Sequence, residues 1–149
     1  MALPEFRDDG WLPEGHHLTN WEEIMLRFGG EPDSQRRQVL SRLLQWRDAV
    51  RKRGMGGFLI LNGSFVSQKT APGDFDCLFI YDDATEQMVK EDEEAQALTD
   101  YLRCKAEWQA DIFAFPETTV RNHPAFCRLD GFDLHKSTRK PKGVVEVRI

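Results

Sequence analysis

The fold is decided by the stretch Leu61-Asn-Gly-Ser-Phe-Val-Ser-Gln-Lys-Thr-Ala-Pro-Gly-Asp-Phe-Asp76, which joins two apolar segments. The first segment, 58–61, follows two glycines and ends at the turn-forming residues Asn62, Gly63 and Ser64. The second segment, 74–81, alternates between two faces after its opening aspartates. Short apolar runs bounded by such turn residues are typical of buried strands. We therefore predict a strand at 58–61, a sharp turn, and a second strand at 74–81.

Helical patterns lie on both sides of this strand pair. The longest predicted helix, 34–53, has apolar residues at positions 39, 43, 46 and 50 and either Asp33 or Ser34 as its N-cap. A capping box that begins at Thr19 predicts a short helix ending near Phe28. The acidic stretch 82–94 leads into a third predicted helix, Glu91 to Lys105, because acidic side chains favour helix N-termini.

Two further strands complete the predicted sheet, one at 108–115 and one at 143–149. Residues 1–18 are interpreted as an N-terminal arm with little regular structure, and 117–142 as an irregular basic segment. The predicted fold class is α/β (α+β), a small mixed β-sheet with the helices 34–53 and 91–105 packed against it. The strand order does not follow from the sequence.

The composition fits a single domain spanning residues 1–149. Twenty Lys plus Arg against 25 Asp plus Glu give a net charge of −5, which argues against nucleic-acid binding through the overall electrostatic field. Cys77, Cys104 and Cys127 show no metal or disulfide spacing and predict reduced thiols. The sequence has neither a signal peptide nor an apolar run near the roughly 20 residues of a membrane span, so we expect a cytoplasmic protein without a membrane partner.

Three aspartates, Asp74, Asp76 and Asp111, are the candidate catalytic and metal-ligating residues. Residues two apart on a strand share a face, and neighbouring strands lie about 4.8 Å apart, so Asp111 can lie beside the pair. Carboxylates that close repel one another unless a divalent cation lies among them, and Mg²⁺ prefers such oxygens. Gly63 allows a close backbone approach, and Ser64 can offer its N–H and hydroxyl to a phosphate.

The order of these residues resembles the polymerase-beta-type nucleotidyltransferase superfamily. The features that carry the resemblance are Gly63-Ser64, a gap of nine residues, the Asp74-x-Asp76 pair flanked by apolar residues, and the later strand residue Asp111. Within that superfamily the stretch 61–76 is similar to a family of short, largely uncharacterised bacterial nucleotidyltransferase-like proteins, and so are the segments 6–21 and 141–149. The resemblance spans most of the chain and implies a minimal nucleotidyltransferase-like fold.

The resemblance also implies a reaction: transfer of a nucleoside monophosphate from a nucleoside triphosphate to a protein or RNA acceptor, with two Mg²⁺ or Mn²⁺ ions. Asp74 and Asp76 would hold both ions, and Asp111 would hold one and help to deprotonate the acceptor hydroxyl. Gly63-Ser64 would bind the terminal phosphates. Lys69 is the nearest cation within the loop, and its position and charge suggest that it pairs with the triphosphate.

Other interpretations remain open. Small domains of this superfamily resemble halves of toxin–antitoxin or phage-defence pairs, so we expect a protein partner by resemblance. The alternative function is a non-catalytic binding module, such as an antitoxin or assembly subunit that retains the fold. The small size, the acidic stretch 82–94 and the aromatic residues of the N-terminal arm suggest it. In a third interpretation the aspartates only cap structural elements.

Overall fold

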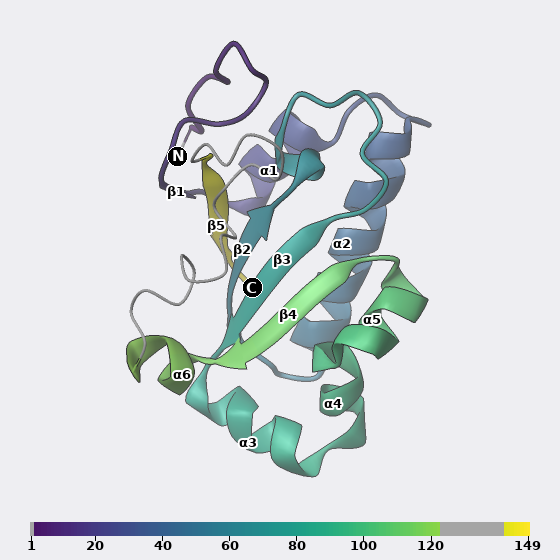
Figure 1. Cartoon of the computed structure of the whole chain (residues 1–149). Coiled ribbons are helices and arrows are strands. Elements are labelled where there is room, and N and C mark those ends of the chain that lie inside the picture. The colour runs from purple at the N-terminus through teal and green to yellow at the C-terminus, as the bar shows by residue number, and fades with distance from the viewer. Residues whose placement is uncertain (1, 123–141) are drawn as a thin grey trace.

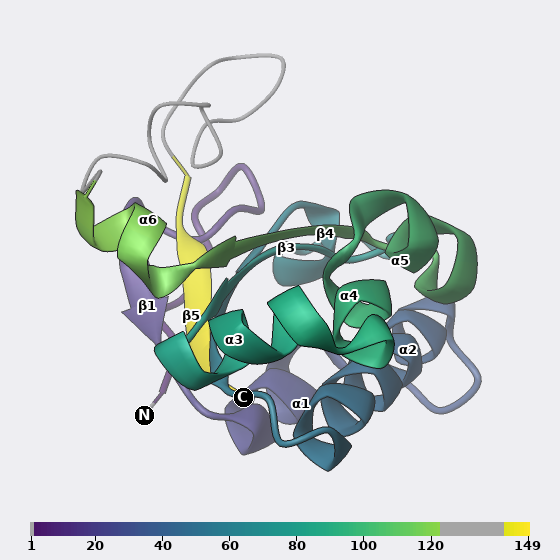
Figure 2. The same ribbon diagram turned by 90° about the horizontal axis from the view of Figure 1, so that it is seen from below.

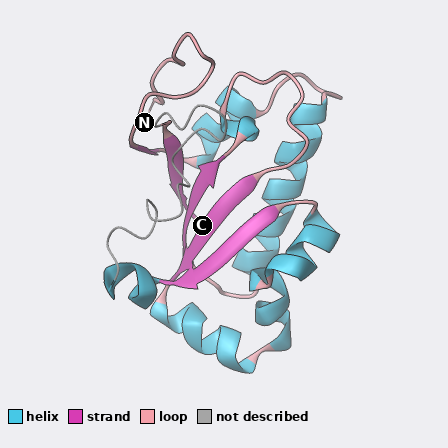
Figure 3. Cartoon of the chain, in the orientation of Figure 1, coloured by secondary structure: helices cyan, strands magenta, loops and turns pink. Residues whose placement is uncertain are grey.

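Among the residues that the computed structural model describes, 2–122 and 142–149, the β-sheet has five strands. These are β1 (His16–Leu18), β2 (Gly57–Asn62), β3 (Asp76–Tyr81), β4 (Asp111–Pro116) and β5 (Val144–Arg148). Their order across the sheet is β1-β5-β2-β3-β4 (Figures 1 and 3). β2 runs antiparallel to β3 and β5, whereas β1 is parallel to β5 and β3 is parallel to β4. The predicted mixed α/β architecture is confirmed.

The described parts of the chain contain α1 (Trp21–Phe28), α2 (Gln35–Lys52), α3 (Asp83–Glu91), α4 (Glu93–Thr99), α5 (Tyr101–Trp108) and α6 (Glu117–Asn122). A short 3-10 turn, η1 (Ser64–Val66), follows β2 directly. The helices α3, α4 and α5 form the crossover that parallel strands such as β3 and β4 require (Figure 1). No helix in these described ranges is long and apolar enough to cross a lipid bilayer.

Side-chain caps define where α1 and α2 begin. The Asn20 side chain accepts a hydrogen bond from the Glu23 backbone N–H at 2.9 Å, so the N-cap of α1 lies one residue after the predicted Thr19. Ser34 caps α2 by accepting a hydrogen bond from the Arg37 N–H at 3.1 Å. Both predicted helices are confirmed, and Ser34 is the cap among the two candidates.

The larger hydrophobic core lies between the sheet and the helices α1, α2, α4 and α5, and Figure 2 shows α1 and α2 on one side of β3 and β4. The rings of Trp46 on α2 and Phe79 on β3 meet edge to face with centroids 5.3 Å apart. The Trp46 indole N–H donates to the Leu98 carbonyl, which ties α2 to α4. Leu78 and Ile80 belong to a smaller cluster on the other face of the sheet, so the predicted alternation of this strand is confirmed.

Two predicted boundaries in the crossover were wrong. The helix expected at 91–105 is interrupted, because Asp92 and Asp100 adopt extended conformations and each becomes the N-cap of the following helix. The strand expected at 108–115 begins only at Asp111, because α5 continues to Trp108 and Gln109 closes it in the left-handed conformation with φ +53°.

Two predicted irregular segments contain regular structure. The N-terminal arm contains β1, whose residues His16, His17 and Leu18 pair with β5. The segment 117–142 begins with α6, which follows β4 without a break. The rest of that segment, 123–141, lies outside the described residues.

Candidate functional site

Three strand ends meet at one edge of the sheet. Because β3 and β4 are parallel, their first residues, Asp76 and Asp111, are register partners. Because β2 is antiparallel to β3, its last residue, Asn62, pairs with Asp76 at the same edge. Register partners on neighbouring strands project their side chains from the same face. The backbone therefore places Asn62, Asp76 and Asp111 side by side.

Asp74 reaches this edge from the loop before β3. The strand begins at Asp76 rather than at the predicted Asp74. One carboxylate oxygen from each of Asp74, Asp76 and Asp111 nevertheless lies within 4.8 Å of the others, and all three residues are half-buried. The structure thus brings the three predicted acids together in one cluster.

Two side chains of α5 contact the aspartate cluster. The Lys105 Nζ lies 2.9 Å from Asp111 Oδ1 and 3.7 Å from Asp74 Oδ2. The Tyr101 hydroxyl donates to Asp111 Oδ1 at 2.8 Å. The sequence interpretation missed both residues. The available signal was their four-residue spacing on the helix just before Asp111, which places them on one helix face.

These contacts determine the ionisation of Asp111. Burial raises the pKa of its carboxyl, but the hydrogen bonds that it accepts from Lys105 and Tyr101 outweigh burial and hold the pKa below its usual value. The hydrogen bond to Asp111 raises the pKa of Lys105 and that of Tyr101. At neutral pH, Asp111 is therefore an ionised carboxylate beside a charged ammonium group.

Gly63 fits closely against the cluster. Its φ is +80° with ψ −170°, a region that is essentially restricted to glycine. A Cβ atom at this position would overlap Asp76 Oδ2. The predicted turn at Gly63-Ser64 is confirmed, and Ser64 begins η1 beside the aspartates. The glycine lets the backbone approach a carboxylate that any other residue would displace.

Arg36, a buried residue of α2, holds the loop that follows Gly63. Its guanidinium donates to the carbonyls of Ser64, Phe65, Ser67 and Lys69 in the loop, and to that of Phe28 at the end of α1. The residue is only 8% exposed, and burial lowers its pKa. The sequence interpretation missed this role. The signal was an arginine three residues before Val39 on the apolar stripe of α2.

The predicted basic residues Lys69 and Lys142 contact other groups than the three aspartates. The Lys69 residue is exposed, its carbonyl accepts from Arg36, and it lines a shallow pocket with Arg27 and Glu31. Lys142 is buried, and its ammonium lies 4.4 Å from the centroid of the Trp11 ring. Lys136, Arg139 and Lys140, together with His123 and His135, lie outside the described residues.

The donor set fits a hard divalent cation. Three carboxylates supply the oxygen ligands that Mg²⁺ and Mn²⁺ prefer. The Lys105 ammonium already places a positive charge between Asp74 and Asp111, where the three acids need one. Asp74, Asp76 and Asp111 are therefore the residues that could hold a metal ion.

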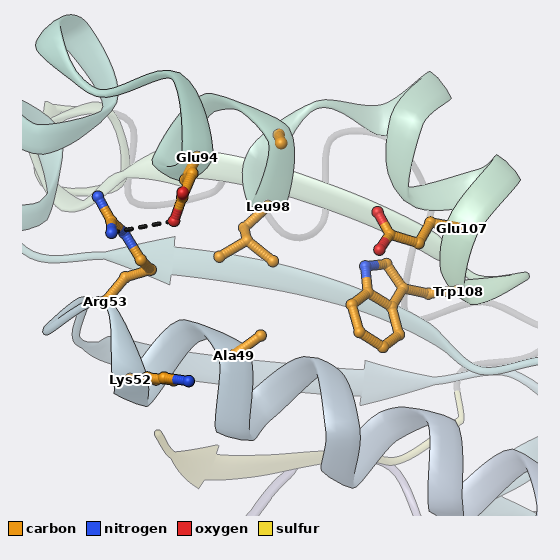
Figure 4. A pocket seen from close by; sticks show the side chains of 8 residues that line it. Ala49, Lys52, Arg53, Glu94, Leu98, Glu107 and Trp108 are labelled. Carbon is orange, nitrogen blue, oxygen red and sulfur yellow. Dashed lines mark ion pairs between the residues drawn. The ribbon is translucent and has the colours of Figure 1, made fainter.

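A separate pocket of about 460 Å³ lies between α2 and the α4–α5 pair (Figure 4). Ala49, Ala97, Leu98 and Trp108 make its apolar lining, and Arg53 is ion-paired with Glu94 at 2.9 Å on its rim. None of the three aspartates lines it. This pocket is therefore not part of the candidate site.

Comparison with known proteins assigns the chain to a family. No curated protein and no solved structure matches it. Residues 4–148 match one family, and this match covers the arm, the sheet, the helices and the aspartate cluster. The chain therefore belongs to DUF6932, a family of unknown function.

Proposed function

We propose that this protein is a metal-dependent nucleotidyltransferase that transfers a nucleoside monophosphate from a nucleoside triphosphate to a hydroxyl group of a protein or RNA acceptor. The observation that carries the proposal is the convergence of Asp74, Asp76 and Asp111 within 4.8 Å beside the glycine turn. A cluster of carboxylates at this spacing suits metal-assisted phosphoryl chemistry.

Each group has a role in binding the triphosphate. Asp74 and Asp76 would hold two Mg²⁺ or Mn²⁺ ions and Asp111 one of them, and the bound ions would stabilise the charge that develops on the reacting phosphate. Gly63-Ser64 would bind the terminal phosphates through the Ser64 N–H and hydroxyl at the start of η1. Lys69 would pair with the triphosphate through its charge, because it is exposed on the loop that follows Gly63-Ser64; in this structure it lines a pocket with Arg27 and Glu31.

In the proposed reaction, the acceptor hydroxyl oxygen attacks the α-phosphorus. The bond between the α-phosphorus and the oxygen that bridges to the β-phosphate breaks, and pyrophosphate leaves. The ionised Asp111 carboxylate accepts the hydroxyl proton. Lys105 orients Asp111 through their 2.9 Å ion pair in the absence of substrate.

A non-catalytic binding module is the second candidate function. The observation that favours it is the pair of contacts from Lys105 to Asp74 and Asp111, which compensates the acids without a metal ion. Leu26 and Leu102 are 76% and 73% exposed and would be available to a partner protein. An antitoxin or an assembly subunit belongs to this class.

We place the proposed activity in the cytoplasm, as one half of a toxin–antitoxin or phage-defence pair. The buried free thiols of Cys77 and Cys104 suit a reducing compartment. The triphosphate substrate and Mg²⁺ are both present there. The protein partner would be either the acceptor or a subunit that positions an RNA acceptor.

Label transfer tests the proposed function. The protein is incubated with each α-³²P-labelled nucleoside triphosphate, Mg²⁺ or Mn²⁺, and cellular RNA and protein, and products are then digested with RNase or protease to identify the acceptor. A double variant, Asp74→Ala/Asp76→Ala, is compared with Glu93→Ala/Glu94→Ala, which removes two exposed acids from α4. We expect label with the wild type and the Glu variant and none with the Asp variant. Identical products from wild type and Asp variant with every triphosphate would refute the proposal.

A further inference from the structure

Two aromatic side chains next to the aspartate cluster are exposed. Tyr101 on α5 is 37% exposed and Phe113 on β4 is 39% exposed. Their rings stack with centroids 5.0 Å apart and an angle of 24° between the planes. Such stacking covers one face of each ring and leaves the outer faces available. Tyr101 and Phe113 are called the aromatic pair below.

The aromatic pair lies directly beside the aspartate cluster. Phe113 lies two residues after Asp111 on β4, so both side chains project from the same face of the sheet, about 6.6 Å apart along the strand. The Tyr101 hydroxyl donates to Asp111 Oδ1 at 2.8 Å. A ligand held by the aspartates can therefore reach the rings with an adjoining group.

The groups follow one order across three neighbouring strands. Gly63-Ser64 directly follows β2, Asp76 begins β3, and β4 carries Asp111 and Phe113. Strands lie about 4.8 Å apart, so β2 and β4 are separated by about 10 Å. A nucleoside triphosphate has the same order of parts over a similar length: terminal phosphates, the phosphate that reacts, and then the nucleoside.

We propose that the aromatic pair binds the base of the nucleoside triphosphate by stacking. The inference rests on the proposed function and adds the position of the base. Stacking on an aromatic side chain accepts every base, because each base has a π-face. The pair therefore binds all four nucleoside triphosphates and leaves the choice among them to other contacts.

Binding of a triphosphate with and without its nucleoside tests the inference. Titration calorimetry on the full chain with Mg²⁺ measures the dissociation constants of ATP, GTP, CTP, UTP and inorganic tripolyphosphate. The variant is Phe113→Ala, and the matched control is Leu102→Ala, which removes a side chain that is 73% exposed next to Tyr101 but outside the stacked pair. Thermal unfolding of each variant checks that the fold is retained.

We expect Phe113→Ala to weaken binding of every nucleoside triphosphate by about 5- to 150-fold, as loss of one base–aromatic stack does, and to leave tripolyphosphate binding unchanged. Leu102→Ala leaves both unchanged. If Phe113→Ala weakens tripolyphosphate equally, or changes neither ligand, the inference is overturned while the proposed function stands. If Phe113→Ala changes only the molecular mass of the protein in solution and leaves the dissociation constants of both ligands unchanged, the aromatic pair contacts a second copy of the chain instead, and the inference is overturned. If the wild type binds neither ligand with Mg²⁺, the proposed function fails and the inference fails with it.

Discussion

Replacing Arg36 by methionine should destabilise the protein strongly, because this side chain joins α2 to the loop beside the candidate site. Arg36 is 8% exposed and donates to five backbone carbonyls, including those of Phe28 at 3.3 Å and Ser67 at 3.0 Å. Methionine keeps much of the apolar stem and removes every donor. The carbonyls would then lack their partner within the protein.

The magnitude follows from these contacts. A hydrogen bond from a charged group contributes about 1.5–3 kcal/mol, and five such bonds to one guanidinium are not additive. Part of this loss is offset because the substitution also removes the cost of burying the guanidinium, a cost visible in the burial-lowered pKa of Arg36. We expect a net loss of about 3–5 kcal/mol, because each buried carbonyl left without its partner costs about 1–3 kcal/mol and the five costs are not additive. In a domain of this size that lowers Tm by roughly 6–20 °C.

Urea unfolding followed by circular dichroism measures the effect, and Arg37→Met is the matched control. Arg37 is the next residue on α2 and is exposed, and it donates to the carbonyls of Gly29 and Gly30 at 2.9 and 2.7 Å. We expect its loss to cost less than about 1 kcal/mol, as for other surface contacts. Equal destabilisation by the two substitutions, or a loss below about 1 kcal/mol for Arg36→Met, would refute the assigned role of Arg36.

Three further predictions concern a turn, an ion pair and the cluster. Gly63→Ala should lower stability by about 1–3 kcal/mol, more than Gly54→Ala, because both glycines have positive φ but a Cβ at Gly54 meets open space; thermal unfolding compares them, and equal losses would contradict this. The hydrogen bond from Arg53 lowers the pKa of Asp92, so the stabilisation from this ion pair is present at neutral pH and declines as the pH falls below about 4 toward the lowered pKa. Asp92→Asn, which keeps a capping side chain, should therefore be less stable than wild type at pH 7, and the difference should narrow steadily as the pH falls below about 4; a constant difference would count against the ion pair. Lys105→Met removes the ammonium group that contacts Asp74 and Asp111 and competes with a metal ion for these carboxylates. The substitution should therefore lower the Tm in the absence of metal and tighten Mn²⁺ binding, measured by electron paramagnetic resonance. Weaker Mn²⁺ binding would show instead that Lys105 assists metal binding.

The sequence was sufficient for β2, β3 and the turn after β2 because their signals are local. The predicted strands at 58–61 and 74–81 and the intervening turn identify β2, β3 and the loop between them. The meeting of Asp76 and Asp111 follows once β3 and β4 are neighbours, since parallel register pairs their first residues. The pairing of β3 with β4 depends on the tertiary fold, which the local sequence pattern does not specify. The sequence therefore predicted the cluster only on the condition that the two strands are neighbours.

The residues and boundaries that the sequence interpretation missed depend on tertiary contacts, which the local sequence pattern does not contain. Arg36 and Lys105 act through groups far along the chain or on another element, so charge and position on a helix alone do not reveal their partners. The breaks at Asp92 and Asp100 were missed because aspartate near a helix start is compatible with one long helix or with a new cap. β1 has only three residues and exists through its pairing with β5.

The most direct test of the proposed metal and nucleotide site is thermal unfolding of wild type and Asp76→Asn with each nucleoside triphosphate, with and without Mg²⁺ or Mn²⁺. Asp83→Asn, which changes an exposed aspartate on α3, is the matched control. A ligand at 100 times its dissociation constant stabilises by about 2.7 kcal/mol, which raises the Tm by roughly 5–10 °C. We expect a metal-dependent rise in Tm in wild type and Asp83→Asn that is lost in Asp76→Asn. No rise with any triphosphate, or an equal rise in all three proteins, would contradict it.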